Sequence, residues 1–403
     1  MSFENLKLDK RICDILKQNK LLKPTEIQLK SIPVIMSGND VVGVSKTGTG
    51  KTLSFLLPII SRLLQSDRSF YCLIITPTRE LAIQINKNVS LFESLGVRST
   101  LLIGGEKTSE QVNKLKEHPH IVIGTPGRIH KHIGNIKIKR FKILVLDEAD
   151  RFFEEDYKDS MKVILSSLRS KIQKIMTTAT ITENLRNSLD KEKIIDVSEN
   201  KLKIEKLKEF YYFVPRRFKE CFLFSFCKSN SDCKIMVFVN MRVTAMFLSH
   251  VLIKMGIEND VLTGEQKQSQ RESVLDGFRS NKYNVLVTTD VGSRGIDVPD
   301  VDYVINFDIP SQQKDYTHRI GRTARAEMTG SAITLVTQYD LPSFQKLEHD
   351  IGEKINVFNY EKDYKIYEDQ FEESKDWAYK QIKEEKQNKP KKAFKKGFKK
   401  TGR

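Results

Sequence analysis

Two short motifs in the N-terminal half of the chain contain residues suited to nucleotide hydrolysis. SKTGTGKT at 45–52 follows the apolar run VVGV at 41–44, and DEAD at 147–150 follows ILVL at 143–146. A glycine-bearing loop between a strand and a helix presents backbone N–H groups to phosphate oxygens. Adjacent acids at a strand tip can bind a divalent cation and orient a water molecule. Together the two motifs predict magnesium-dependent hydrolysis of a nucleotide.

The loop at 45–52 has the residues that a phosphate-binding loop needs. Gly48 and Gly50 let the backbone close around phosphate, Lys51 can reach the β- and γ-phosphates, and the Thr52 hydroxyl can ligate magnesium. Ser45 stands where the usual pattern has glycine. A chance GKT in a surface turn is the alternative, and the strand-loop-helix setting argues against it. We expect nucleotide contacts from Ser45, Lys46, Thr47, Gly48, Thr49, Gly50, Lys51 and Thr52.

The two acids that end the ILVL run predict separate roles. Asp147 is the expected magnesium partner, and Glu148 is the expected base that orients the attacking water. Two acids can also open a helix to complement its dipole. That alternative fits Asp150 and Glu154 but does not explain why acids end an apolar strand.

Three arginines near the C-terminal end of the motif series lie three residues apart, at Arg319, Arg322 and Arg325. On a helix this spacing would place them roughly along one face. An arginine beside a γ-phosphate contributes about 10³- to 10⁵-fold in rate. Alone, such a face is usually a solvated surface, but a phosphate loop elsewhere in the chain favours a catalytic role for Arg322 and Arg325.

The apolar runs predict two tandem parallel α/β sheets. Short continuous runs that alternate with helix-length amphipathic segments are typical of strands buried on both faces. A charged connector separates two such series at about 190–208. We expect the site in the cleft between the domains, since ligands of open sheets bind at the carboxyl ends of strands. The expected strands lie at 41–44, 73–76, 100–104, 121–124, 143–146 and 175–180, and at 235–239, 260–264, 285–290, 303–308 and 332–336.

Composition places the chain among globular proteins of more than one domain. It has 403 residues, 39% hydrophobic and 30% charged, and no apolar stretch approaches the roughly 20 residues of a membrane helix. The N-terminal sequence lacks a secretory apolar region, so we expect a soluble intracellular protein without membrane contact. The five cysteines form no CxxC pair, which favours buried free thiols over disulfides or zinc.

The formal charge of +16 is concentrated at the C-terminus. Residues 380–403 carry eleven Lys or Arg against two Glu, a net charge of +9. Phe394 and Phe398 are the large apolar residues of AFKKGFKK, too few to offset ordering entropy, so we expect disorder. The tail is either a solubilising or nuclear-import extension or an arm that binds a polyanion, and the two readings are compatible.

Further motifs, in this order along the chain, resemble the DEAD-box RNA helicases of superfamily 2. The resemblance extends from about Phe3 to Asp350 and implies two RecA-like domains. We expect domains at 1–198 and 209–360, a linker at 199–208 and a disordered Lys-rich extension at 361–403. The additional motifs are PTEIQ at 24–28, PTRELA at 77–82, the Gly104–Gly105 pair, TPGR at 125–128, TAT at 178–180, VFVN at 237–240, QSQR at 268–271, TTDVGSRGID at 288–297 and YTHRIGRTAR at 316–325.

The resemblance implies roles for residues outside the phosphate loop. Gln28, with Thr25, would read adenine, since an amide can accept from N6 and donate to N7. Asp297 would contact the ribose of ATP. Asp150, Thr178, Thr180 and His318 would connect hydrolysis to RNA. The expected RNA contacts, to sugar and phosphate, are Pro77, Thr78, Arg79, Gly105, Thr125 and Arg128 in the first domain and Asn240, Arg271, Thr289 and Arg294 in the second.

ATP, Mg²⁺ and RNA are therefore the expected ligands of a monomeric ATP-dependent RNA helicase. Leu21 stands where family members have an aromatic residue that stacks on the base, so we expect weak nucleotide affinity. TATIT at 178–182, VTQYD at 336–340 and the short Lys-rich tail most resemble the nucleolar subgroup acting in small-subunit assembly, with ribosomal-RNA precursor as substrate and a protein activator. An ATP-gated RNA clamp with slow turnover and a cytoplasmic translation-initiation helicase stay open as alternatives.

Overall fold

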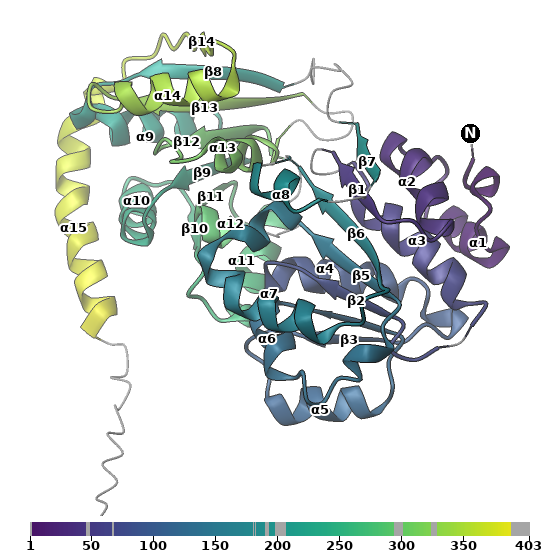
Figure 1. Ribbon diagram of the computed structural model, residues 1–403. Coiled ribbons are helices and arrows are strands. Elements are labelled where there is room, and N and C mark those ends of the chain that lie inside the picture. The colour runs from purple at the N-terminus through teal and green to yellow at the C-terminus, as the bar shows by residue number, and fades with distance from the viewer. Residues whose placement is uncertain are drawn as a thin grey trace, which may run out of the picture.

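The computed structural model contains two parallel seven-stranded sheets with helices on both faces of each (Figure 1). It describes residues 2–45, 49–66, 68–179, 181, 183–189, 193–197, 207–293, 301–323 and 329–387. The first sheet has the strand order β3-β4-β2-β5-β6-β1-β7 and the second β10-β11-β9-β12-β13-β8-β14. Taken strand by strand in chain order, the two orders are the same, as expected of two domains built on one plan.

The N-terminal domain contains the first seven strands. Its strands are β1 (Val41–Val44), β2 (Cys72–Ile75), β3 (Ser99–Leu102), β4 (Ile121–Gly124), β5 (Ile143–Asp147), β6 (Gln173–Thr178) and β7 (Lys193–Asp196). Its helices are η1 (Phe3–Leu6), α1 (Lys10–Gln18), α2 (Glu26–Met36), α3 (Lys51–Leu63), α4 (Arg79–Ser90), η2 (Glu93–Leu95), α5 (Thr108–Lys116), α6 (Pro126–Lys131), η3 (Ile138–Arg140), η4 (Ala149–Phe153), α7 (Glu155–Ser167) and α8 (Glu183–Asn187).

The C-terminal domain repeats the arrangement. Its strands are β8 (Leu207–Phe213), β9 (Ile235–Val239), β10 (Asn259–Leu262), β11 (Val285–Thr289), β12 (Tyr303–Asn306), β13 (Gly330–Val336) and β14 (Asn356–Val357). Its helices are η5 (Arg216–Phe218), α9 (Lys219–Ser229), α10 (Arg242–Lys254), α11 (Gln268–Arg279), α12 (Asp290–Ser293), α13 (Gln313–Ile320), α14 (Leu341–Ile351), η6 (Lys365–Tyr367) and α15 (Glu368–Gln387).

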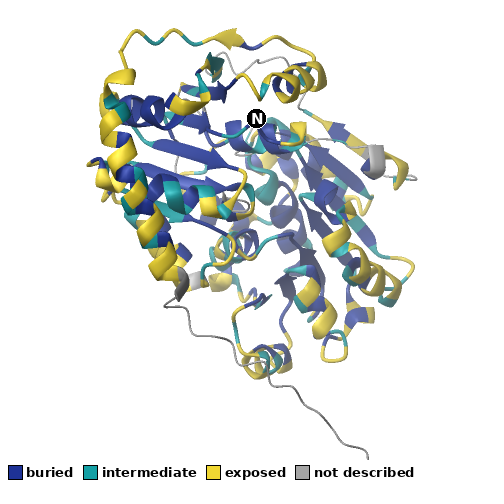
Figure 2. Ribbon diagram, turned by 90° about the vertical axis from the view of Figure 1, so that its left-hand side faces the viewer, coloured by how far each residue is buried: buried dark blue, intermediate teal, exposed yellow. Residues whose placement is uncertain are grey.

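Each sheet is buried on both faces, which explains the continuous apolar runs in its strands (Figure 2). In β2, Ile74 packs into one core of the N-terminal domain, while Leu73 and Ile75 pack into the core on the other face. In β9, Val237 and Phe238 likewise belong to separate cores. The expected two-sheet α/β fold is confirmed.

The connector between the domains contains more structure than we expected. β7 lies within it and pairs with β1, and β8 begins at Leu207, inside the expected linker. The two strands escape apolar-run analysis because β7 is only four residues long and β8, LKEFYYF, is half-exposed. Residues 198–206 lie outside the described part of the chain.

The expectation of disorder throughout 361–403 is wrong for its first part. Helix α15 runs along the outside of the C-terminal domain beside α10 (Figure 1). Phe371, Ala378 and Ile382 on α15 are buried, and the Trp377 ring meets His250 edge-on at 5.8 Å. These apolar residues recur at helical spacing, a pattern that the composition of the Lys-rich end conceals. Residues 388–403, where disorder was also expected, lie outside the described part.

The expectation of buried free thiols agrees with the structure for four of the five cysteines. Cys13, Cys72, Cys221 and Cys227 are buried free thiols, and Cys233 is a half-buried one. No helix in the described ranges has the length and apolarity needed to cross a bilayer. In the same ranges, no group of three or more His, Cys, Asp or Glu side chains is arranged to hold a metal ion.

Candidate functional site

Strand order divides the carboxyl edge of the first sheet into two halves. β5, β6 and β1 are neighbours, so the DEAD acids, the TAT motif and the phosphate loop meet at one place. β3, β4 and β2 form the other half, which gathers the motifs beginning at Gly104, Thr125 and Pro77. One half therefore holds the expected nucleotide residues, and the other holds the expected RNA residues.

The phosphate loop is anchored to both of its neighbours. The Ser45 backbone N–H donates to the Thr178 carbonyl at 3.1 Å, and the Ser45 hydroxyl lies 2.8 Å from that of Thr49. Lys51 begins α3 and donates to the Ser45 carbonyl at 2.5 Å, while Thr52 is half-buried on the same turn. The site residues Lys46, Thr47 and Gly48 lie outside the described part of the chain.

Gln28 connects the PTEIQ motif to this loop. Its Oε1 accepts from the Thr25 backbone N–H at 2.9 Å, and its Nε2 donates to the Gly50 carbonyl at 3.0 Å. Gly50 has φ +87°, and a Cβ there would lie 2.4 Å from Gln28 Nε2. Only glycine fits this close approach. The amide that we expect to read adenine is therefore held on the phosphate loop, with one N–H and one lone pair left for a ligand.

The DEAD acids occupy three different environments. Asp147 is buried and accepts from the Thr177 hydroxyl and the Glu148 N–H. Burial raises the pKa of Asp147 to about 6, the Thr177 hydrogen bond opposes this, and Glu148 adds repulsion. Glu148 has φ +54°, a left-handed conformation that costs energy in a non-glycine residue, and its buried Oε2 has no hydrogen-bond partner among the described residues. Asp150 Oδ1 accepts from the Thr178 hydroxyl at 2.8 Å.

These features fit a divalent cation. A buried carboxylate with a raised pKa gains from a nearby positive charge, and oxygen ligands suit Mg²⁺. Asp147 supplies carboxylate oxygens at the end of β5, and Thr52 supplies a hydroxyl oxygen at the end of the phosphate loop. Glu148 Oε2 has no hydrogen-bond partner within the described residues, so it can accept a hydrogen bond from a ligand.

In the RNA half of the first sheet, the guanidinium of Arg79 lies against the backbone of Gly104 and Gly105. Arg79 is exposed at the start of α4, after the buried Pro77 and the half-buried Thr78, which caps the helix. A Cβ on Gly104 would lie 2.4 Å from Arg79 Nη2, and one on Gly105, at φ +98°, would lie 3.5 Å from Nη1. The Gly pair therefore lets the guanidinium lie flat on the backbone.

The TPGR motif directly follows β4, and its Pro126 begins α6. Thr125 is the half-buried N-cap residue of α6, and Arg128, one turn on, has a buried Nη1 with no hydrogen-bond partner in the part of the chain that the structure describes. His132 contacts Gln111 at 2.9 Å, and Gln111 donates to the Ile103 carbonyl. This buried chain, which sequence reasoning missed, supports the loop that contains the Gly pair.

The second domain contributes a matching edge. Asn240 directly follows β9 and is exposed, and Thr289 ends the neighbouring strand β11, where its hydroxyl accepts from the Gly292 N–H at 3.2 Å. Arg271 is buried rather than open to a nucleic acid strand, since it pairs with Glu80 of the first domain at 2.8 Å and donates to the Gly292 carbonyl. Arg294 and Asp297 lie outside the described part of the chain.

Arg319 and Arg322 do not lie on one helix face, and that part of the expectation is wrong. α13 ends at Ile320, so it contains Arg319 but not Arg322. The Arg319 side chain is 1% exposed and donates to Asp290, Asn240 and the Asp308 carbonyl. Arg319 is thus a buried part of the second domain. Arg322 is buried beyond the helix end, and Arg325 lies outside the described residues.

His318 lies where the DEAD motif meets the second domain. Burial lowers its pKa to about 4; Asp150 opposes the shift, and Arg151 and Arg322 add to it. The same junction contains Glu154, which accepts from Arg151 at 3.2 Å and from Lys314 of α13 at 2.7 Å. Thr180, also expected to couple the domains, lies outside the described part. The structure therefore brings Asp150, Thr178 and His318 together across the domain boundary.

Fold and site define a protein of two RecA-like domains, with residues suited to a nucleotide and to a nucleic acid strand on the sheet edge of the first domain. The profile of the DEAD/DEAH box helicases matches residues 25–188, and that of the helicase conserved C-terminal domain matches residues 214–327. The chain belongs to the DEAD-box family of ATP-dependent RNA helicases. Among curated relatives, it is 43% identical to the ATP-dependent rRNA helicase RRP3 of Encephalitozoon cuniculi (89% of this chain, 91% of the relative). It is 38% identical to the probable ATP-dependent RNA helicase DDX47 of Homo sapiens (89% and 80%).

Comparison with solved structures indicates how the two domains are placed relative to each other. The DEAD-box helicase Mss116 bound to ssRNA and UDP-BeF superposes with a TM-score of 0.81 at 27% identity (93% of this chain, 83% of that chain). A variant of S. cerevisiae Dbp5 bound to RNA and ADP BeF3 gives 0.80 at 25% identity (93% and 99%). A DEAD box protein from Methanococcus jannaschii gives 0.53 at 31% identity (89% and 99%). Since a whole-chain score depends on domain placement, the domains here are arranged more as in the two RNA-bound structures.

Proposed function

We propose that this protein is an RNA-stimulated ATPase that separates short RNA duplexes or remodels RNA–protein complexes during ribosomal-RNA processing. The observation that supports this most directly is the contact between the domains. Glu80 pairs with Arg271 beside the expected RNA residues, and Glu154 pairs with Lys314 beside the DEAD acids. Both contacts exist only when the two sheets face each other, so closure brings the nucleotide and RNA halves of the first sheet against the second domain.

In this proposal the expected site residues have the following roles. Gln28, Lys51 and the loop backbone hold ATP against the first domain. Glu148, in its strained conformation, accepts a proton from the attacking water. Arg322 and Arg325 approach the γ-phosphate from the second domain and stabilise the charge on the transferred group. Mg²⁺, held by Asp147 and Thr52, would neutralise charge on the phosphate oxygens.

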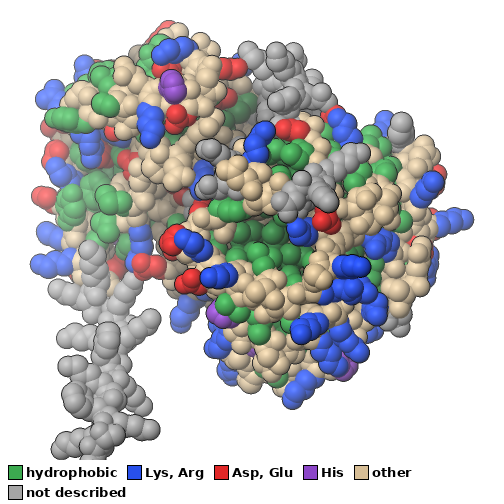
Figure 3. All heavy atoms as spheres, viewed as in Figure 1, with side chains coloured by type: hydrophobic (Ala, Val, Ile, Leu, Met, Phe, Trp, Pro, Cys, Tyr) green, Lys and Arg blue, Asp and Glu red, His purple; other side chains and the backbone are tan. Residues whose placement is uncertain are grey.

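RNA would be held by backbone contacts on both sides of the cleft. Arg79 and Thr125 in the first domain are suited to contact phosphate oxygens. In the second domain, Asn240 and Thr289 offer hydrogen bonds to ribose. Only the closed state provides both halves of the track, so ATP and RNA should each tighten the binding of the other. The Lys and Arg side chains gathered over the lower part of the N-terminal domain in Figure 3 would favour approach of a polyanion.

The proposed substrate and compartment rest on the relatives. The E. cuniculi relative is named an rRNA helicase, so we propose precursor ribosomal RNA as the substrate and the nucleolus as the compartment. A monomer and a protein activator complete the proposal. Imaging a tagged copy of the protein tests the compartment, since a uniformly cytoplasmic signal would favour a translation-initiation role.

The test of the activity is a steady-state ATPase assay with and without single-stranded RNA, run beside a strand-separation assay on a short RNA duplex. We expect ATP turnover to rise at least about tenfold with RNA, and the duplex to separate only when ATP is present. An ATP hydrolysis rate that is the same with and without RNA would contradict the proposal. RNA-stimulated turnover without strand separation would leave the ATP-gated clamp.

A further inference from the structure

Asn240 is exposed, yet almost every polar group it has is already held in place. Its backbone N–H donates to Asp308 Oδ2 at 2.9 Å. Its side-chain Nδ2 donates to the Ile309 carbonyl at 3.0 Å, and its Oδ1 accepts from Arg319 Nη2 at 2.9 Å. One N–H and one lone pair of the amide stay available to a ligand. An exposed side chain fixed in this way loses little conformational entropy when it binds.

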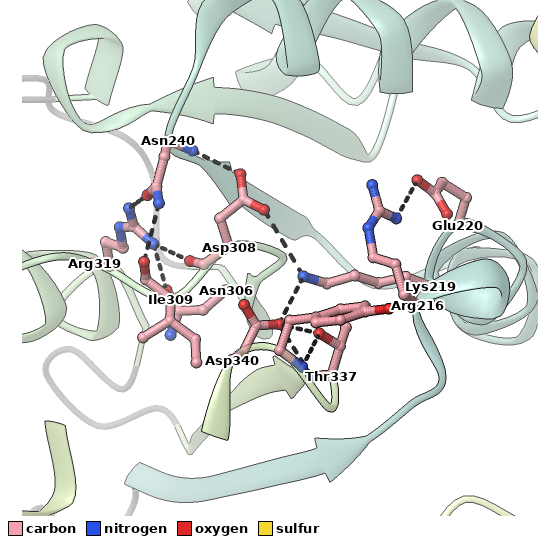
Figure 4. A network of polar contacts seen from close by, with 11 residues as sticks. Arg216, Lys219, Glu220, Asn240, Asn306, Asp308, Ile309, Arg319, Thr337 and Asp340 are labelled. Carbon is pink, nitrogen blue, oxygen red and sulfur yellow. Dashed lines mark hydrogen bonds and ion pairs between the residues drawn. The ribbon is translucent and has the colours of Figure 1, made fainter. Parts of the chain in front are cut away.

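Near Asn240 lies a buried lysine, Lys219, which pairs with acids of its own domain. Lys219 begins α9, and its side chain is 5% exposed. Its Nζ lies 3.8 Å from Asp308 Oδ1, 3.7 Å from Asp340 Oδ2 and 4.7 Å from the centre of the Phe307 ring (Figure 4). Asp308 therefore binds the Asn240 N–H with one oxygen while its other oxygen faces the ammonium group.

The two carboxylates around Lys219 differ in what else they hold. Asp340 Oδ2 accepts from the Thr337 N–H at 3.0 Å and from the Thr337 hydroxyl at 2.7 Å, which fixes the turn after β13. Only Asp308 reaches Asn240. The segment VTQYD, which sequence analysis singled out as a subgroup feature, thus supplies the second carboxylate of this cluster, named here the Lys219 cluster (Lys219, Asp308, Asp340).

Removing a charge from the Lys219 cluster changes the surroundings of Asn240. Lys219 is the nearer cation to Asp308 and Asp340 among the described residues, and Arg216, which pairs with Glu220 at 3.0 Å, lies farther from both. Without Lys219 these two half-buried carboxylates lose their nearer counter-charge. A carboxylate that loses its counter-charge takes up a proton or moves toward water. Either change loosens the bond to the Asn240 N–H. Excess negative charge would also repel phosphates of a strand bound at this edge.

We propose that Lys219 is a positioning residue for RNA, acting through Asp308 to hold Asn240 in its binding orientation. The inference rests on the proposed function, since it requires RNA to bind at the β9 edge. Lys219 itself touches no RNA. It acts on affinity for RNA and leaves the hydrolytic residues of the first domain in place.

The first test replaces Lys219 with Met, which keeps the length of the side chain and removes its charge. RNA-stimulated ATPase activity is measured at increasing concentrations of single-stranded RNA, and thermal melting reports folding. We expect Lys219→Met to raise the half-saturating RNA concentration about 2- to 10-fold, because the Asn240 side chain would then lose conformational entropy when RNA binds. The maximal rate at saturating RNA should stay within about twofold. Lys219→Arg, which restores the charge, should recover most of the RNA affinity.

Lys234→Met is the matched control. Lys234 is a partly buried lysine of the same domain, donates to the Phe278 carbonyl at 2.9 Å, and precedes β9 at the end opposite Asn240. We expect it to leave the half-saturating RNA concentration unchanged. Equal shifts in the two variants, or none in a folded Lys219→Met protein, would overturn the inference.

A second comparison applies if Lys219→Met does not fold. Asp308→Asn and Asp340→Asn each remove one negative partner of Lys219, but only the first affects the acceptor of the Asn240 N–H. We expect Asp308→Asn to weaken RNA affinity and Asp340→Asn to keep it near the wild-type value. Equal effects would contradict a route through Asp308. If RNA fails to stimulate the wild-type protein, it is the proposed function that fails.

Discussion

Arg271 and Glu80 form an ion pair across the domain boundary, with 2.8 Å between Arg271 Nη1 and Glu80 Oε1 and both side chains less than a tenth exposed. Burial raises the pKa of Glu80, and Arg271 opposes that shift. Two charged groups that are solvated when the domains separate thus lose water on closure and must recover that energy from each other. Closure is therefore favourable only when the RNA-binding residues of the two domains are aligned so that Arg271 meets Glu80.

Glu80→Gln should weaken the coupling between ATP and RNA. The change leaves Arg271 buried without its counter-charge in the closed state only, so closure becomes less favourable. We expect the factor by which an ATP analogue tightens RNA binding to fall about 5- to 100-fold, measured by fluorescence anisotropy. Glu110→Gln, at an exposed partner of Lys107, is the control and should leave the factor unchanged. An unchanged factor in Glu80→Gln would show that the pair is incidental.

Glu148→Gln should abolish most hydrolysis while both ligands still bind. Loss of a general base typically costs about 10²- to 10⁴-fold in rate, and the amide keeps the size of the side chain. Single-turnover hydrolysis with saturating RNA measures the effect. Glu155→Gln, an exposed residue at the start of α7, is the control and should hydrolyse ATP normally. An undiminished rate in Glu148→Gln would refute its role as the base.

Arg322→Lys and Arg319→Lys should fail in different ways. Arg322 is expected at the γ-phosphate, so its lysine variant should fold normally and lose about 10³-fold or more in turnover. Arg319 holds Asp290, Asn240 and a backbone carbonyl with its guanidinium fork, which lysine cannot reproduce. Arg319→Lys should therefore lower the melting temperature and RNA affinity. A normal melting temperature in Arg319→Lys would contradict its place as a buried support.

Closure should weaken in acid because of His318. Its pKa is about 4 in the closed structure, against an ordinary value of 6.5, since burial and the nearby Arg151 and Arg322 disfavour the imidazolium despite Asp150. Above pH 6.5 the ring is neutral whether the domains are open or closed, and closure has no proton to lose. Between pH 6.5 and about 4 the open state binds a proton that the closed state excludes, which costs closure up to about tenfold per pH unit.

The measurement is the ATP–RNA coupling factor between pH 5 and 8 in the wild type and in His318→Gln. We expect the wild-type factor to be level above pH 6.5 and to fall below it. The variant should lose that part of the slope, because its amide does not titrate. Parallel profiles in the two proteins would assign the acid sensitivity to other groups.

Leu21→Phe should tighten ATP binding. Leu21 is half-buried against the N-terminal core at the position where the family has an aromatic residue. A ring that stacks on the base would add about 0.5–1.5 kcal/mol, or about 2- to 10-fold in affinity. Titration with a fluorescent ATP analogue measures the change. The exposed neighbour Leu22 provides the control variant Leu22→Phe, and equal gains in both would argue against specific stacking.

Some features followed from local sequence because their causes are local. Apolar runs such as those ending at Asp147 and Asn240 marked strands buried on both faces, and the polar residues directly after them marked the carboxyl edge of each sheet. Gly50 and Glu148 could be assigned to loop and strand tip from their neighbours alone. Strands with less distinctive patterns, β7 and β8, were missed, since pairing with β1 and β13 rather than their own composition stabilises them.

Only the tertiary structure decided what each charged residue contacts. Arg319 and Arg322 belong to one motif with regular spacing, but the helix ends between them, so Arg319 lies within α13 and Arg322 is buried beyond the end of α13. Arg271 pairs with Glu80, and Lys219 with Asp308, across sequence distances that no local pattern encodes. Charge and spacing along a chain limit what a side chain can do, whereas its partners depend on how distant segments pack.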